Sequence, residues 1–236
     1  MGDMKISVII PLYNENGTIE KLLKKVDSVK LDKEIIIVDD YSTDGSREWL
    51  KNLKAKNIKK VFHDKNYGKG MAIRSGIKEV SGDIVIIQDA DLEYDPNDYY
   101  ELVKPIQEGK AEVVYGSRIL GNLIKNLRNK HTEAYYEYYY GGRILTLLAN
   151  ILYNAKITDE PTCYKVFKAD IIKKINLKCK RFEFCPEVTA KVRKMGYKIH
   201  EIPIKYNPRT LSEGKKIKFR DGFEAVWTLI KYRFVN

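Results

Sequence analysis

The sequence is poor in the residues that build disulfide frameworks and zinc sites. Its 236 residues include three cysteines and three histidines, and the cysteines form no CxxC pair. An odd, sparse set of cysteines without a secretory leader is typical of reduced thiols in the cytosol. We therefore expect Cys163, Cys179 and Cys185 to be small interior residues, and we predict neither a disulfide nor a structural zinc ion.

The sequence also lacks a long apolar stretch. Its longest apolar run, ILTLLANILY at residues 144–153, is interrupted by Thr146 and Asn150 and is shorter than the roughly 20 residues that span a bilayer. Met1–Lys5 lead directly into an apolar strand, which is unlike a signal peptide. With no GxxxxGK[ST] loop, ATP hydrolysis is not indicated either. We expect a cytoplasmic protein that is not an integral membrane protein.

Acidic residues are scarce in the second half of the chain. Residues 1–118 contain 19 Lys and Arg against 21 Asp and Glu, whereas residues 119–236 contain 24 against 11. The second half is therefore expected to face something anionic, such as nucleic acid, acidic lipid headgroups or phosphorylated substrates. Nucleic acid is the least favoured of these, because the sequence has no motif of interleaved aromatic and basic residues.

Strand and helix patterns alternate along residues 1–118. The predicted strands are 6–12, 34–38, 61–62, 84–87 and 112–115, and the predicted helices are 19–26, 46–53, one that follows the loop at 66–70, and 98–108. Continuously apolar strands that alternate with helices predict the α/β class, with a Rossmann-like, mostly parallel sheet flanked by helices. Ligands bind such sheets beyond the carboxyl ends of the strands.

Polar residues follow several of these predicted strands and mark one edge of the sheet as the candidate site. They are Asn14 and Glu15, Asp39 and Asp40, the loop NYGKG at 66–70, Asp89 and Asp91, and Ser117 and Arg118.

The second half has two amphipathic helical patterns, at 134–153 and 221–234. The first is rich in Tyr and then in aliphatic residues, and the second places Phe223, Val226, Trp227 and Ile230 on one stripe. Either pattern fits a membrane-facing helix or a pair of helices packed in the core, and the basic charge of this half favours the membrane surface. HEIPIKYNPRT at 200–210 alternates as a strand does. We find no linker or repeat, so residues 1–236 are expected to form a single domain.

A cluster of four carboxylates, Asp89, Asp91, Glu93 and Asp95, follows the strand at 84–87. Asp89 and Asp91 are two positions apart, so they are expected to lie on one face, where a cation between them would relieve their repulsion. A hard divalent ion, Mg²⁺ or Mn²⁺, fits such oxygen ligands. A solvated acidic loop is the alternative. Asp95 precedes Pro96 and is expected to mark the turn before the next helix.

Five ordered blocks carry a family resemblance: ISVIIPLYNE, EIIIVDDYSTDGS, NYGKGMAIRSG, SGDIVIIQDADLEYDP and VVYGSR. Together they resemble the family 2 glycosyltransferases, which are inverting enzymes with the GT-A fold. They are most similar to the branch typified by dolichol-phosphate mannose synthase, which includes undecaprenyl-phosphate sugar transferases. The resemblance is strong over residues 5–118 and looser over 158–167, 182–204 and 207–216. It implies a nucleotide-sugar-binding half at 1–118 and an acceptor-binding, membrane-facing half at 119–236.

The resemblance also implies roles for individual residues. Residues expected to bind the nucleotide are Pro11, Tyr13, Glu15, Asp39, Asp40, Gly68, Lys69, Asp89 and Ala90. Among them, Tyr13 offers a stacking face, Asp40 could accept the ring N–H of uracil or guanine, and Gly68 would let the backbone approach the nucleotide. Asp89 and Asp91 would be catalytic through the bound metal, with Glu93 as an undecided third ligand.

For the acceptor, the residues suggest two alternatives. A phosphate acceptor needs cations, and the candidates are Arg118, Arg143, Arg209 and Lys215. A hydroxyl acceptor needs a carboxylate base, for which Asp159 and Glu187 are candidates, although either could instead orient the cations.

The resemblance thus implies metal-dependent, inverting transfer from a UDP- or GDP-sugar to a polyprenyl (dolichyl or undecaprenyl) phosphate. The protein would be peripheral on the cytosolic face of a membrane, where a membrane-protein partner could recruit it. The alternative is transfer to a sugar hydroxyl of a polysaccharide or lipid-linked glycan.

Overall fold

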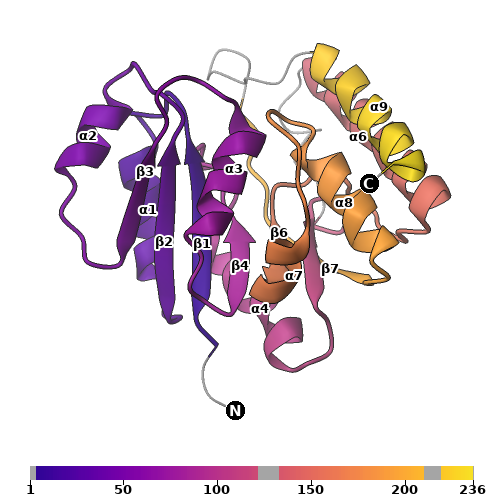
Figure 1. The fold of residues 1–236 in the computed structure, drawn as a ribbon, viewed down its shortest axis with the longest axis horizontal. Coiled ribbons are helices and arrows are strands. Elements are labelled where there is room, and N and C mark those ends of the chain that lie inside the picture. Colours follow the sequence, from indigo (N-terminus) through magenta and orange to yellow (C-terminus); the bar gives the residue numbers. More distant parts are fainter. Residues whose placement is uncertain (1–3, 122–132, 210–218, 236) are drawn as a thin grey trace.

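The computed structural model describes the backbone of residues 4–121, 133–209 and 219–235. Within these residues, seven strands form one sheet in the order β3-β2-β1-β4-β6-β5-β7 (Figure 1). The strands are β1 (Ile6–Leu12), β2 (Lys33–Asp39), β3 (Ile58–Phe62), β4 (Ile84–Ile87), β5 (Val113–Ser117), β6 (Lys165–Lys168) and β7 (Ile199–Pro203). All neighbours are parallel except β6, which runs antiparallel to both β4 and β5. The predicted, mostly parallel sheet is confirmed.

Helices cover both faces of the sheet, which explains why its central strands are apolar throughout. The helical elements are α1 (Ile19–Ser28), α2 (Ser46–Asn52), α3 (Lys69–Lys78), η1 (Pro96–Asp98), α4 (Tyr99–Gln107), α6 (Glu133–Tyr153), α7 (Ala169–Lys174), α8 (Phe184–Lys194) and α9 (Phe219–Phe234). Helix α3 packs on β1 and β2, and α4 packs on β5 and β6. Every residue of β4 is buried, as burial on two faces requires.

The long strand predicted at 200–210 is wrong beyond Pro203, where β7 ends. Ile204 N still donates to Ser117 O at 3.1 Å, but the chain then leaves the sheet and Tyr206 makes an isolated bridge to Tyr94. The tyrosine rings of this bridge pack with centroids 5.1 Å apart. Contacts with the loop after β4 thus override the alternating pattern.

Helices α6 and α9 lie side by side on the outside of the molecule, next to α8 (Figure 1). Their outer faces carry exposed apolar side chains at matching helical spacing. These are Tyr140, Ile144, Leu147 and Ile151 on α6, and Phe223, Trp227, Ile230 and Phe234 on α9. We call these eight residues the α6/α9 face. Each helix also buries its other face in the core, where Ala149 of α6 and Leu229 of α9 are fully buried, so both expectations for these helices hold in part.

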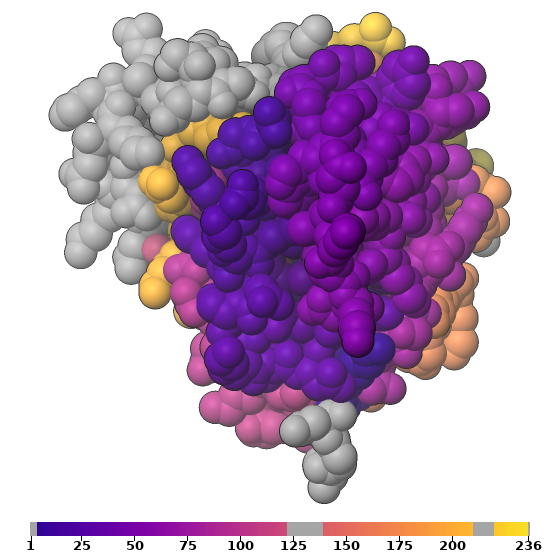
Figure 2. Space-filling model, turned by 90° about the vertical axis from the view of Figure 1, so that its left-hand side faces the viewer, coloured from indigo at the N-terminus to yellow at the C-terminus, as the bar shows by residue number. Residues whose placement is uncertain are grey.

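Two further features of the described residues limit what the α6/α9 face can be. Among the helices of these ranges, none is both long enough and apolar enough to cross a membrane. Figure 2 shows the molecule from another side, where residues of the N-terminal half form most of the coloured surface and residues of the C-terminal half appear at its margins.

Candidate active site at the carboxyl edge of the sheet

The predicted convergence of strand ends is present at the carboxyl edge of β1, β2 and β4. The last residue of β1, Leu12, is in register with Asp39 at the end of β2. On the other side of β1, Gln88 N donates to Ile9 O at 2.9 Å, which aligns the start of the Asp89 loop with the same edge. Tyr13, which follows β1, is 37% exposed. The edge therefore combines an accessible aromatic ring with several carboxylates.

Asp39 and Asp40 are buried and bind groups of the protein itself. Asp39 pairs with Arg47 at 2.5 Å. Asp40 contacts His63 Nδ1 at 2.7 Å and accepts a hydrogen bond from Gly68 N at 2.7 Å. Asp40 therefore holds the glycine loop through these bonds, and its contact with a nucleotide base stays a prediction. His63 follows β3 directly and is a further polar residue at this edge, which its position after the strand at 61–62 could have indicated.

The glycine loop is shaped by contact with a segment from the other half of the chain. Gly68 has φ +95°, and a Cβ there would lie 2.5 Å from Lys180 O. A Cβ on Gly70 would lie 2.8 Å from Arg181 O. The backbone N–H groups of Gly70 and Met71 donate to these two carbonyls at 2.9 and 3.0 Å. The glycines are thus required by the contact with residues 180–181, whereas the sequence suggested an approach to the nucleotide.

Asp89 and Asp91 leave β4 as predicted, with different partners. Lys69 Nζ lies 2.6 and 2.8 Å from the two carboxylate oxygens of Asp89. Burial and the charges of Asp89 and Glu93 together raise the pKa of Asp91 to about 8. A carboxyl group with a raised pKa lies close to other negative charges. A cation bound nearby would reduce this repulsion.

Glu93 is turned toward the segment that follows β7. Its carboxylate accepts hydrogen bonds from Tyr206 Oη at 2.8 Å and Arg209 N at 2.7 Å, and its carbonyl accepts one from Asn207 N at 2.8 Å. Glu93 thus anchors residues 206–209, which speaks against its role as the third metal ligand. Asp95 caps η1 by accepting from Asn97 N at 3.1 Å, so its predicted turn role is confirmed.

Arg209 joins three strand-end segments. Its guanidinium pairs with Glu15 at 2.6 and 3.2 Å and donates to Asp91 O at 2.8 Å. Glu15 was expected to bind nucleotide and Arg209 to bind acceptor phosphate, and the structure places the two in direct contact. The remaining predicted nucleotide contacts are the half-buried Pro11 within β1 and the buried Ala90 between the two aspartates.

Arg118 and Asp159 form a bidentate ion pair after β5. Arg118 Nε and Nη2 each lie 2.8 Å from one oxygen of Asp159, and the guanidinium stands 5.0 Å from the centroid of the Tyr206 ring. Burial disfavours the charged arginine, but Asp159 outweighs this and raises the pKa of Arg118. Asp159 in turn is held by Glu201, which accepts its backbone N–H at 3.1 Å. This geometry fits the alternative in which Asp159 orients a cation.

Glu187 is buried in α8 and does not have the surroundings of a general base. It accepts backbone hydrogen bonds from Lys178 at 2.7 Å and Cys179 at 2.6 Å, and it pairs with Lys191. Burial opposes the charged form, yet these donors lower the pKa of Glu187. Its role as a catalytic base is therefore not supported, because the carboxylate is committed to holding the 178–179 turn.

Two acceptor candidates remain. Arg143 is exposed on α6 and donates to Thr158 O at 2.9 Å, next to the Arg118–Asp159 pair. Lys215 lies outside the described residues. The cysteines are free thiols: Cys163 and Cys179 are buried and Cys185 is partly buried.

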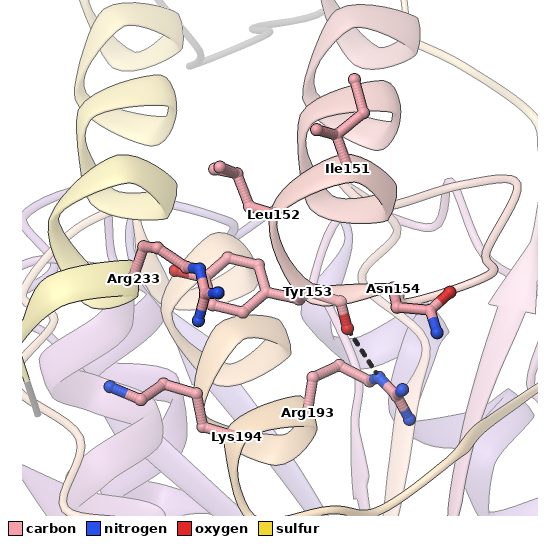
Figure 3. Close-up of a pocket in the computed structure, with 7 residues that line it drawn as sticks. All are labelled: Ile151, Leu152, Tyr153, Asn154, Arg193, Lys194 and Arg233. Atoms are coloured by element: carbon pink, nitrogen blue, oxygen red, sulfur yellow. Dashed lines mark hydrogen bonds between the residues drawn. The ribbon is translucent and has the colours of Figure 1, made fainter.

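A pocket of about 370 Å³ lies away from these strand ends, among the carboxyl ends of α6, α8 and α9 (Figure 3). Arg193 donates to Tyr153 O at 3.3 Å, and Lys194 donates to Tyr232 O at 3.0 Å. These side chains satisfy carbonyls at helix ends, where positive charge is favourable. The pocket is therefore explained by helix capping and contains none of the site carboxylates.

The fit of a divalent ion rests on the donor set at the carboxyl edge. Asp89 and Asp91 supply hard oxygen ligands. Within the described ranges, no group of three or more His, Cys, Asp or Glu side chains is arranged to hold a metal ion by itself. Mg²⁺ is commonly bound by one or two carboxylates, with substrate phosphates completing its shell. The two aspartates fit a metal ion that arrives with a phosphorylated ligand.

An α/β sheet with paired aspartates after β4 and with arginines around the same edge is what the resemblance to glycosyltransferases with the GT-A fold leads one to expect. The profile described as Glycosyl transferase family 2 matches residues 7–176. The chain belongs to glycosyl transferase family 2.

Curated relatives match almost the whole chain. It is 28% identical over 235 residues to a dolichol-phosphate mannosyltransferase of Pyrococcus furiosus, covering 97% of this chain and 64% of that protein. It is 29% identical over 251 residues to a UDP-N-acetylglucosamine–dolichyl-phosphate N-acetylglucosaminyltransferase of Methanococcus voltae, covering 98% and 96%. A low-salt glycan biosynthesis hexosyltransferase, Agl6 of Haloferax volcanii, is 28% identical over 98% of this chain, which spans 53% of that protein.

The solved structures support the fold. Glucosyl-3-phosphoglycerate synthase from Mycobacterium tuberculosis, in complex with Mn²⁺, UDP and glucosyl-3-phosphoglycerate, superposes with a TM-score of 0.72 at 18% identity, covering 99% of this chain and 81% of that one. The same enzyme with Mg²⁺ and UDP gives a TM-score of 0.71 at 18% identity, covering 99% and 80%. The expected GT-A fold is confirmed.

Proposed function

We propose that the chain transfers a sugar, with inversion, from a UDP- or GDP-sugar to a polyprenyl phosphate at the cytosolic face of a membrane. The observation that carries this proposal is that both candidate bases, Asp159 and Glu187, are hydrogen-bonded to groups of the protein itself. Asp159 is engaged by Arg118, and Glu187 is buried among donors of its own helix and turn. A hydroxyl acceptor would need one of them to take its proton, whereas a phosphate acceptor would not.

A phosphate monoester is largely dianionic at neutral pH, because its second pKa is near 6. It therefore needs cations that hold it in line with the sugar, and Arg118 and Arg209 stand at the appropriate edge. A guanidinium has five N–H donors, and the pair with Asp159 uses two of the donors of Arg118. Each arginine is fixed by its carboxylate, Asp159 or Glu15, so that the cationic groups are preorganised for an anion.

On the donor side, Asp89 and Asp91 would hold Mg²⁺ or Mn²⁺, which when bound would neutralise charge on the nucleoside diphosphate leaving group. Tyr13 presents its exposed ring at the end of β1 and would stack on the base. Asp40 would act indirectly, by fixing the loop that carries Lys69.

The acceptor is tested by incubating the protein with labelled sugar nucleotides, Mg²⁺ and dolichyl or undecaprenyl phosphate. We expect label in the organic phase, and we expect Glu187→Gln to retain turnover in the fraction that folds. Transfer of label to a soluble glycan, with none in the organic phase, would overturn the lipid acceptor and favour a sugar hydroxyl. The M. voltae relative is named for a UDP-sugar and a dolichyl phosphate, which supports this choice of substrates.

The nucleotide is tested by thermal unfolding with UDP, GDP and their sugars in the presence of Mn²⁺. A ligand that binds the folded protein stabilises it by mass action. We expect one uridine or guanosine series to raise the melting temperature, and a response confined to ATP or to nucleic acid would contradict the donor class.

The α6/α9 face supports a membrane location. Its apolar residues are flanked by Arg143, Arg220, Lys231 and Arg233, and these are the exposed charged residues on the described parts of the two helices. Apolar side chains with basic neighbours describe a helix pair that lies in the interface of an anionic membrane. Each basic residue near such lipids contributes about 1 kcal/mol.

Sedimentation with vesicles of phosphatidylcholine and phosphatidylglycerol tests this location. We expect binding that weakens with salt and that drops about tenfold or more in Leu147→Glu with Trp227→Glu, since each change removes buried apolar area and adds repulsion. Tyr100→Glu on α4 is the matched control, because it changes an exposed aromatic residue on the N-terminal half. Equal binding by the parent chain, the double variant and Tyr100→Glu would contradict a membrane-binding α6/α9 face. Binding only to vesicles that contain a membrane protein would show that this protein, and not the lipid, recruits the chain.

A further inference from the structure

The ion pair between Lys69 and Asp89 links the glycine loop to the paired aspartates. Lys69 is the first residue of α3, and its ammonium lies 2.6 and 2.8 Å from the two oxygens of Asp89. The side chains are 22% and 16% exposed, so water screens the pair only in part. Burial disfavours the ammonium, but Asp89 outweighs this and raises the pKa of Lys69. The lysine is therefore charged throughout the neutral range.

The backbone at this helix start is already engaged. Gly68 N donates to Asp40 at 2.7 Å, and the backbone N–H groups of Gly70 and Met71 donate to the carbonyls of Arg181 and Lys180. These three N–H groups already have acceptors, so a diphosphate near this loop would bind the ammonium of Lys69 instead. The side chain is long and has three rotatable donors, so it can change partner without moving the loop.

A divalent ion on Asp89 and the ammonium of Lys69 require the same carboxylate oxygens. Binding of the ion alone would displace the ammonium and leave it without a counter-charge in a half-buried place, which is costly. A donor diphosphate beside the ion would give the displaced ammonium a new anionic partner. We propose that Lys69 is an exchangeable counter-ion that moves from Asp89 to the donor diphosphate, and that it makes the binding of divalent ion and nucleotide cooperative.

This inference rests on the proposed function, because it assumes a nucleoside diphosphate donor and a divalent ion. The coupling is reciprocal: the nucleotide strengthens metal binding by the same factor by which the metal strengthens nucleotide binding. Replacing Lys69 with a neutral side chain removes the competitor for Asp89 and also the partner for the diphosphate. Affinity for the ion alone should then rise while affinity for the nucleotide falls.

The test is a titration of the intact chain with Mn²⁺, without and with saturating UDP or GDP, followed by electron paramagnetic resonance of unbound Mn²⁺. We expect the nucleotide to tighten Mn²⁺ binding in the unmodified chain by about tenfold or more, within the usual range of coupling. In Lys69→Met we expect tighter binding of Mn²⁺ alone and a coupling factor several-fold smaller than in the unmodified chain, with the remainder coming from direct attraction between the ion and the diphosphate. Lys69→Gln serves as a second variant if melting curves show that the Met variant is poorly folded.

Lys65→Met is the matched control, because Lys65 is an exposed lysine of the same loop that stands over the Tyr67 ring. It removes the same charge and should leave the coupling factor unchanged. The inference is overturned if Lys69→Met keeps the coupling of the unmodified chain, or if both lysine variants lose it equally. If the unmodified chain binds neither UDP nor GDP with Mn²⁺, the proposed function falls together with the inference.

Discussion

Glu34 and Asp91 are carboxylates at opposite ends of the same sheet, and their surroundings move their pKa values in opposite directions. Glu34 lies at the start of β2, where Ser7 Oγ and Ser81 N donate to it at 2.6 and 2.7 Å. Burial opposes its charge, but these donors and Lys59 lower its pKa to about 2. Asp91 follows β4 among other carboxylates, and its pKa rises to about 8.

The difference separates a structural edge from a functional one. At the amino edge both oxygens of Glu34 accept hydrogen bonds from the protein, so the carboxylate is ionised and stabilises the fold. At the carboxyl edge the protein concentrates negative charge that its own groups do not fully neutralise. Carboxylates with raised pKa values at a ligand-binding edge are candidates for function. The following predictions test whether residues at the two edges of the sheet differ in their effects on activity and stability.

The largest effect is expected from Asp91→Asn. Loss of a charged ligand at the carboxyl edge should lower sugar transfer by about 10²–10³-fold, measured with labelled donor. Glu34→Gln is the matched control, the same change at the other edge, and should leave turnover per folded molecule unaltered. Comparable losses in both variants would remove the distinction between the edges.

The same Asp91 variant should be more stable than the parent chain in buffer with a chelator. Because the pKa of Asp91 is raised from 3.8 to about 8 in the folded chain, stability is lost as the pH rises between these two values. The variant has no such cost, so its advantage in urea unfolding should grow from pH 5 to about pH 8 and then level off. A constant difference over that range would show that Asp91 titrates as an ordinary carboxyl group.

Gly68→Ala tests whether the carboxyl edge also depends on precise backbone packing. At φ +95°, and with a Cβ 2.5 Å from Lys180 O, the alanine should cost about 2 kcal/mol or more of unfolding free energy. Gly17→Ala, where a Cβ meets nothing within 4 Å, should change stability by less than about 0.5 kcal/mol. Equal stability of the two variants in urea would contradict the loop contact.

Glu34→Gln should lower the unfolding free energy at pH 7 by about 1–3 kcal/mol, because buried donors lose a charged acceptor. A lowered pKa contributes stability that is present above the unfolded value of 4.5 and is lost as the pH falls toward about 2. The difference between parent and variant in urea unfolding should therefore shrink from pH 4.5 downward. A difference that persists at pH 2 would point to packing in place of charge.

The smallest effect is expected from Asp95→Ala, which removes the cap of η1. It should cost about 1 kcal/mol or less and leave sugar transfer and Mn²⁺ binding unchanged. Asp95→Asn, which keeps an acceptor, should restore most of the stability. A clear loss of transfer in the alanine variant would extend the functional cluster beyond Asp91.

Much of the fold was predictable because its signals are local. Apolar runs such as 84–87 and the polar residues after them were enough to predict the sheet and its active edge. What could not be predicted are partners brought from distant segments. The role of Glu187 depends on the 178–179 turn, and that of Glu93 depends on Tyr206, which the alternating pattern had assigned to a strand. Gly68 was recognised as necessary, but Lys180, the neighbour that makes it so, carries no sequence signal.

The segment that follows β7 has a consequence for biosynthesis. Arg209 pairs with Glu15 across 194 positions of the chain, and its neighbours fasten to Glu93. Contacts of such separation form late, since a long loop must close first. During translation the carboxyl edge therefore stays incomplete until residue 209 has left the ribosome.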